Sequence, residues 1–101
     1  MGLLTINLRE KLTQEEMDFA ARLLYYLDTV TGDEKLKRRV KASAGQLIAS
    51  PVFKRKECKE LADLLLLSSR VLITESEKKG NEVSENDKQL MLALINKIKL
   101  L

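Results

Sequence analysis

The sequence predicts an all-α protein, a compact bundle of about four helices with a short extended segment at its N-terminus. The 101 residues contain only one proline and four glycines, so the turn residues that a β-sandwich or barrel needs are scarce. Hydrophobic residues make up 45% and charged residues 33% of the chain, a balance typical of folded proteins. A chain of this length suits one helical domain over residues 1–101.

The first ten residues have a different pattern from the rest. The stretch LTINL alternates apolar and polar residues, and a period of two is typical of extended backbone. We expect residues 1–10 to form an N-terminal arm or a short strand. The first helix is predicted at about residues 13–31, because Thr13 and Glu16 have the spacing of a capping box and Gly32 offers a stop.

The second helix is predicted at about residues 33–50. Thr31 or Asp33 can accept hydrogen bonds from its first N–H groups as the N-cap. Pro51 marks its end, because a proline disfavours helical geometry in the residue before it.

The third helix is predicted at about residues 51–79, with a serine cap before it and Pro51 at its first position, where a missing N–H has no consequence. Gly80 offers its C-terminal stop. The fourth helix is predicted at about residues 84–100, because Ser84 and the aspartate three positions later have capping-box spacing.

Apolar side chains cover most of the circumference of the third predicted helix around the run LADLLLLSSRVLI. A helix with so wide an apolar surface needs neighbours on two or three sides. Either the other helices of the same chain supply them, or a second copy or a partner protein does. The first helix is also apolar over more than half its circumference. We expect a homodimer, with an assembly interface at Leu64, Leu67 and Val71. Of these three residues, only Leu67 falls on the polar side of the third predicted helix.

Positive charge is concentrated in the middle of the chain. Nine Lys and Arg residues between positions 35 and 59 stand against one acid, a net charge of +8, whereas the remainder carries −5. If the second and third helices fold back on each other at Ser50 and Pro51, these cations form one basic surface. The predicted partner-binding residues are Lys35, Arg38, Arg39, Lys41, Lys54, Arg55, Lys56 and Lys59.

Three interpretations of this basic surface stay open. It binds an acidic protein, it binds nucleic acid, or it is simply a solvated face. No aromatic residues are interleaved with the cations for base stacking, and a short helix followed by a very long one does not resemble a helix-turn-helix. We therefore place the protein partner first.

The chemical inventory of the chain argues against catalysis. There is no histidine, which excludes Ser-His and Cys-His nucleophiles and His-containing metal sites. No phosphate-binding glycine loop and no EF-hand pattern is present. Cys58 lies beside basic residues, so it is either a reactive thiol or, as we expect, a small packing residue. We expect no cofactor, no metal and no small-molecule substrate.

A single cysteine and no recognisable secretion signal predict a cytoplasmic location, and no apolar run approaches the length of a membrane span. The expected function is that of a small non-enzymatic regulatory or inhibitory protein. It would bind an acidic macromolecule, a protein in the first place, through the basic surface of the second and third helices. A nucleic-acid-binding factor that uses the same surface is the alternative.

Overall fold

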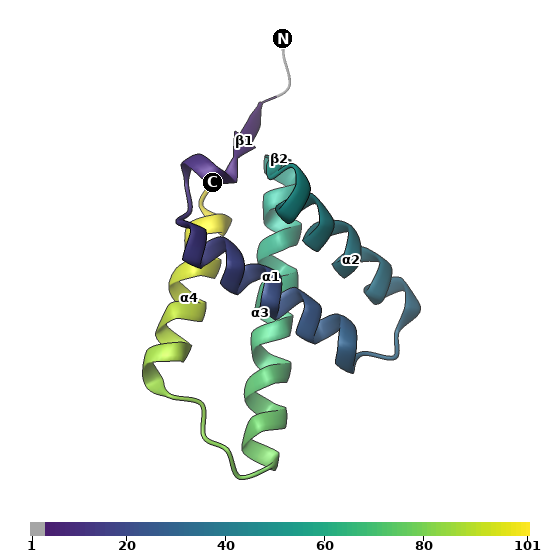
Figure 1. The fold of residues 1–101 in the computed structure, drawn as a ribbon, viewed down its shortest axis with the longest axis vertical. Coiled ribbons are helices and arrows are strands. Elements are labelled where there is room, and N and C mark those ends of the chain that lie inside the picture. The colour runs from purple at the N-terminus through teal and green to yellow at the C-terminus, as the bar shows by residue number, and fades with distance from the viewer. Residues whose placement is uncertain (1–3) are drawn as a thin grey trace.

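The computed structural model describes residues 4–101 (Figure 1). Within this range the chain forms four α-helices, α1 at Gln14–Val30, α2 at Glu34–Ala49, α3 at Arg55–Lys78 and α4 at Glu85–Lys99. Two short strands, β1 at Thr5–Asn7 and β2 at Val52–Lys54, and a 3-10 helix at Leu8–Glu10 complete it. The predicted helical bundle with a short extended segment near the N-terminus is confirmed.

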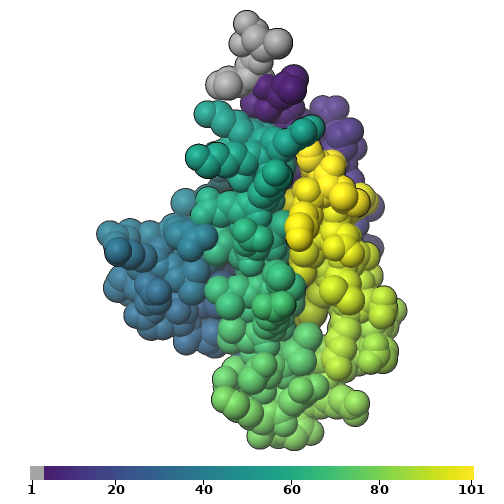
Figure 2. Space-filling model, turned by 180° about the vertical axis from the view of Figure 1, so that it is seen from behind, coloured from purple at the N-terminus to yellow at the C-terminus, as the bar shows by residue number. Residues whose placement is uncertain are grey.

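The longest helix, α3, runs through the middle of the bundle. In Figure 1, α1 crosses it and packs against both α2 and α3, while α4 packs along α3. The helices α2 and α3 meet near β2 and diverge from there, so they do not form the close hairpin that the sequence had led us to expect. Seen from behind, α3 is uncovered between α2 and α4 (Figure 2).

Local signals set most helix ends. The Thr13 hydroxyl accepts from the Glu16 N–H at 3.1 Å and the Glu16 carboxylate accepts from the Thr13 N–H at 2.8 Å, so the predicted capping box exists. Asp33 caps α2, and Ser84 caps α4. Gly80 has φ +78° just after α3, a backbone conformation that favours glycine.

The predicted start of the third helix at Pro51 is wrong. Residues 52–54 are instead β2, which pairs antiparallel with β1 and places Phe53 opposite Ile6. The Leu8 N–H extends this pairing by donating to the Pro51 carbonyl at 2.8 Å. A strand partner more than 40 positions away therefore decides the conformation of this segment.

Side chains along β2 alternate between the inside and the outside. Phe53 is only 1% exposed, while Val52 and Lys54 on either side of it face solvent. The helix α3 then begins at Arg55, and the Glu57 carboxylate accepts from the Lys54 N–H at 2.8 Å. Burial of the phenylalanine ring favours the strand over a helix that would begin at Pro51.

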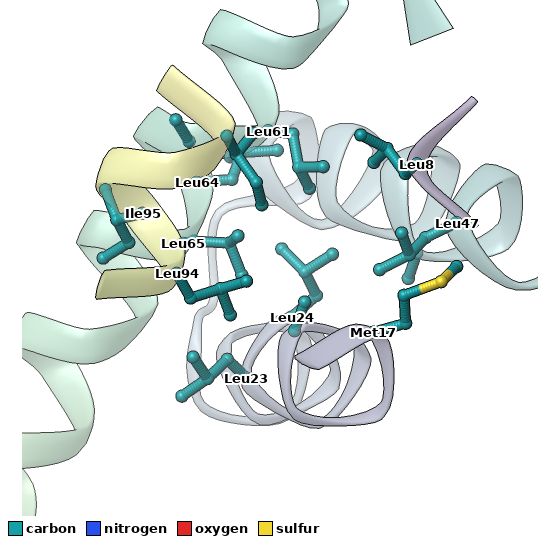
Figure 3. Close-up of a cluster of buried hydrophobic side chains, with 14 of the residues drawn as sticks. Leu8, Met17, Leu23, Leu24, Leu47, Leu61, Leu64, Leu65, Leu94 and Ile95 are labelled. Atoms are coloured by element: carbon teal, nitrogen blue, oxygen red, sulfur yellow. The ribbon is translucent and has the colours of Figure 1, made fainter. Parts of the chain in front are cut away.

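The core lies where α1, α2, α3 and α4 converge (Figure 3). Leu64 and Leu65 point into it and meet side chains of α1 and α4, including Leu24 and Leu94. Leu66 is half-buried against the same core. Neighbours within the chain therefore cover these three residues of the leucine run.

The wide apolar surface of α1 has the same explanation. This helix packs against α2 and α3 at once, and its apolar surface supplies buried residues such as Leu23, Leu24 and Leu27. Neighbours on two sides require a wide apolar surface. Intramolecular packing thus accounts for most of the apolar surface that had led us to expect a second copy.

Candidate functional site

All eight predicted partner-binding residues are exposed. They fall into two groups, one on α2 and one at the joint between β2 and α3. The α2 group is Lys35, Arg38, Arg39 and Lys41, and the joint group is Lys54, Arg55, Lys56 and Lys59.

One ion pair connects the two groups. The Arg39 Nε donates to the Glu60 Oε1 at 2.8 Å, from the middle of α2 to the second turn of α3. Both side chains are about half exposed, so the pair contributes about 0.2–1 kcal/mol. The pair links the two helices beside the joint, although they are not packed closely there.

Lys41 does not belong to the same surface as Arg39. Two residues of α-helix turn the side-chain direction by about 200°, and Arg39 already points toward α3. Lys41 therefore projects from the opposite flank of α2. Lys35 and Arg38 lie between these two directions, on the solvent side of the helix.

The joint group sits at an electrostatically unfavourable place. Lys54 is the N-cap of α3, and Arg55 and Lys56 are its first two residues. The N-terminus of a helix carries about half a positive charge, so each cation there destabilises the helix by about 0.3–1 kcal/mol. Glu57 is the one acid in this first turn, and its carboxylate already accepts the Lys54 N–H.

Most of the predicted partner-binding residues have no acidic partner in the described part of the chain. In residues 4–101, five Lys or Arg side chains lie within 4 Å of a carboxylate, and Arg39 is the one that belongs to the predicted set. Seven of the eight are thus available to an outside anion without breaking an ion pair. Lys37, which is not one of the eight, pairs with Asp28 of α1 at 3.5 Å.

The predicted assembly interface loses one of its three residues. Leu64 is 2% exposed and belongs to the core, because α3 turns this side toward its neighbours. Val71 is half-buried against the core. Leu67 is 39% exposed, between the exposed charges of Asp63 and Arg70, and a single leucine among charges is ordinary for a protein surface.

Cys58 is a packing residue. Its side chain is 1% exposed, and burial, together with the negative charge of Glu57, raises the pKa of the thiol even though Arg55 acts in the opposite direction. A thiol with a raised pKa holds less thiolate at neutral pH and reacts slowly. Burial and the raised pKa both favour the packing role that we expect for Cys58 over that of a reactive thiol.

Sequence reasoning missed two features of this surface. Glu60 lies one residue beyond the basic segment, and only the approach of α2 to α3 brings it against Arg39. Val52 is exposed on the same face of β2 as Lys54, since alternate residues of a strand share a face. Because residues 52–54 were predicted to be helical, this alternation of exposed and buried side chains was not expected.

Comparisons with known proteins find no matching family model, no significantly similar curated protein and no significantly similar solved structure. Among residues 4–101 no three Cys, Asp or Glu side chains are grouped to hold a metal ion. In the same range no helix is both long enough and apolar enough to cross a membrane. Function is therefore inferred from the residues and their placement.

Proposed function

We propose that this chain is a non-enzymatic regulatory or inhibitory protein that binds an acidic surface of a partner protein. The binding surface is the joint group with Lys35, Arg38 and Arg39 of α2. One observation carries the proposal: three cations occupy the N-cap and first two positions of α3, where they destabilise the free protein. Local rules of this kind are broken mainly at functional sites.

An acidic partner would relieve this unfavourable electrostatics. A carboxylate near the first turn of α3 would meet the cationic side chains and the positive end of the helix dipole together. The six unpaired cations of this surface supply attraction over several sites, which raises the association rate more than the final affinity. We therefore expect binding that depends strongly on ionic strength.

A protein partner fits the surface better than a single-stranded nucleic acid does. Such nucleic acids bind where aromatic side chains stack on the bases, and Phe53, the aromatic residue of this segment, is buried. The exposed side chain that precedes Phe53 in β2 is apolar and aliphatic, Val52. An apolar contact among charges is typical of protein interfaces.

The test compares two labelled anionic probes, a polyglutamate peptide and a DNA duplex, by fluorescence polarisation over a range of salt concentrations. The test variant combines Arg38→Glu with Lys56→Glu, which changes the local charge by four units. At about 0.3–0.5 kcal/mol for each unit, polyglutamate affinity should fall about tenfold.

The matched control combines Lys79→Glu with Lys99→Glu, which makes the same change in net charge on exposed residues outside the basic surface. Its affinity for polyglutamate should change less than about threefold. Equal losses in both double variants would show that net charge alone drives binding and would overturn the proposal.

The DNA probe separates the alternative function. If the duplex binds and polyglutamate does not, and if the salt slope for the duplex falls by about two units in the test variant, the surface binds nucleic acid. Undetectable binding of both probes at low salt would contradict both functions.

A further inference from the structure

A second surface lies near the C-terminal end of α3, whereas the joint group of basic residues lies at its start. A groove of about 830 Å³ opens between the first half of α1, the last turns of α3, the α3–α4 loop and α4. Figure 1 shows α3 and α4 diverging toward this loop. Apolar side chains form its floor, among them Phe19, Leu72, Met91 and Leu94.

Part of this apolar lining faces solvent. Leu90 lines the groove and is 51% exposed, and Phe19 and Leu72 are half-buried. Unlike Leu67, these residues are not isolated among charges, since they line one concave surface with the buried Met91 and Leu94. A volume of about 830 Å³ falls within the range of ligand-binding clefts in proteins.

The rim of the groove is acidic. Five acids line it, Glu15, Glu16, Asp18, Glu82 and Asp87, against one base, Arg22. The Arg22 guanidinium lies 5.9 Å from the centre of the Phe19 ring, so its charge sits over an apolar wall.

The acidic charge of the groove is only partly compensated. Glu16 pairs with Lys97 at 3.0 Å, which leaves a net charge of about −3 on the lining. The N-termini of α1 and α4 also reach the groove through Thr13 and Ser84, and each contributes about half a positive charge. About two negative charges remain, on a chain whose total charge is +3.

The polar groups do not suit a small polar ligand. Sites for such ligands aim a few buried polar groups at one point. In residues 4–101 the buried side-chain polar atom that makes no hydrogen bond is the Asp28 Oδ1, and Asp28 does not line the groove. Four of the five acids are exposed, whereas the buried residues of the lining, Met91 and Leu94, are apolar.

We infer that the groove binds a basic amphipathic helix of a partner protein. Its apolar stripe, with residues spaced i, i+3, i+4 and i+7, would cover Phe19, Leu72 and Leu90, as in other helix-in-groove complexes. Its flanking Lys and Arg would face the carboxylates of the rim. This inference is independent of the proposed function, because it concerns another surface and a partner of opposite charge.

The probe is a labelled helical peptide of leucine and lysine of about 15 residues, long enough to form a helix. It is compared with a peptide of the same composition whose leucines are scattered around the helix. The amphipathic peptide should bind at least tenfold more tightly, because only its leucines reach the floor together. Both peptides carry the same positive charge and the whole chain is also positively charged, so attraction between net charges cannot explain a difference in their affinities.

Two residues of α4 give a matched pair of variants. Leu90 lines the groove, whereas Leu92 is equally exposed, at 50%, and does not. Leu90→Glu should weaken binding of the amphipathic peptide about tenfold or more, because a carboxylate would have to lose water in the apolar centre. Leu92→Glu should leave binding within about twofold. Circular dichroism checks that both variants are folded.

A second pair tests the rim. Glu82 lines the groove and Glu85 does not, although both are exposed. Glu82→Lys should weaken binding several-fold and reduce its salt dependence, while Glu85→Lys should do neither.

Three results would overturn the inference. The first is equal binding of both peptides, and the second is an equal loss in the Leu90→Glu and Leu92→Glu variants. The third is a wild-type dimer that Leu90→Glu converts to a monomer, because the occupant of the groove would then be a second copy of this chain. None of these results depends on whether the basic surface binds polyglutamate.

Discussion

Lys56→Glu should make the folded protein more stable while it weakens binding through the basic surface. Lys56 is the second residue of α3 and is exposed. Replacing a cation by an anion in the first turn of a helix reverses an interaction of about 0.3–1 kcal/mol. The total change is about 0.6–2 kcal/mol in favour of the variant.

One local term opposes this gain. Lys56 and Glu60 are four positions apart on the exposed side of α3, and a like-charge pair at this spacing is unfavourable by about 0.2–0.5 kcal/mol. The free energy of unfolding should therefore rise by about 0.3–1.5 kcal/mol, which raises the melting temperature by several degrees in a domain of this size.

Urea unfolding at low and high salt measures this effect. The stabilisation should shrink in about 1 M salt, where exposed charges are screened within about 3 Å. Lys59→Glu, one turn further into α3, is the control, because the helix dipole acts mainly within the first turn. A Lys56→Glu variant that is less stable than the wild type, or one that binds polyglutamate as well as the wild type, would refute the reasoning.

Four further predictions test the fold and its titrating groups. Phe53→Ala should lower the free energy of unfolding by about 3–5 kcal/mol, while Val52→Thr on the outer face should change it by less than about 0.5 kcal/mol; similar losses would contradict β2. The pKa of Glu16 is lowered, chiefly because its carboxylate accepts a hydrogen bond from the Thr13 main chain and, to a smaller extent, because Lys97 lies beside it; burial acts in the opposite direction. The free energy of unfolding should therefore fall as the pH drops below about 4.5. Glu16→Gln should reduce this pH dependence in urea titrations. Burial raises the pKa of Cys58 above its ordinary value of 9.0, so stability should decrease as the pH rises past that value and the unfolded thiol ionises; a native thiol that a disulfide reagent labels as fast as the unfolded one would contradict its burial. If the chain is a homodimer through Leu67, light scattering should report twice the monomer mass and Leu67→Asp should lower it, whereas a monomer at all concentrations would contradict that expectation.

The helix ends were largely predictable because capping is local. Thr13 and Glu16, like Ser84 and the residues after it, satisfy N–H groups within three positions of themselves. The sequence alone contains both partners of each hydrogen bond. The bounds of α1, α2 and α4 consequently agree with prediction to within one residue at each end.

The start of α3 was not predictable in the same way. Ser50 and Pro51 form a good local signal for a helix start, but pairing with β1 and burial of Phe53 override it. Both interactions join segments more than 40 positions apart. Three residues of alternating burial are also too few to be recognised as a strand.

The two candidate surfaces also differ in whether their residues are close together in the sequence. The basic residues are close together in the sequence, so their concentration was visible from charge counting, although the place of Lys41 on another flank of α2 was not. The groove collects residues from α1, α3 and α4. In the sequence, Glu15, Glu16 and Asp87 are simply acids in the first turn of a helix, where negative charge is favourable. Only the fold brings them together around one groove.

The two surfaces should act independently, because α3 holds them apart. Lys56 stands at its start, and Leu72, which lines the groove, comes 16 residues later. At 1.5 Å for each residue, about 24 Å of helix separates them, about three times the distance over which physiological salt screens exposed charges. Opposite charges on one small chain therefore do not neutralise each other. Charge reversal at Lys56 should leave binding of the basic peptide unchanged, and Leu90→Glu should leave binding of polyglutamate unchanged, so that a double variant would lose both activities additively.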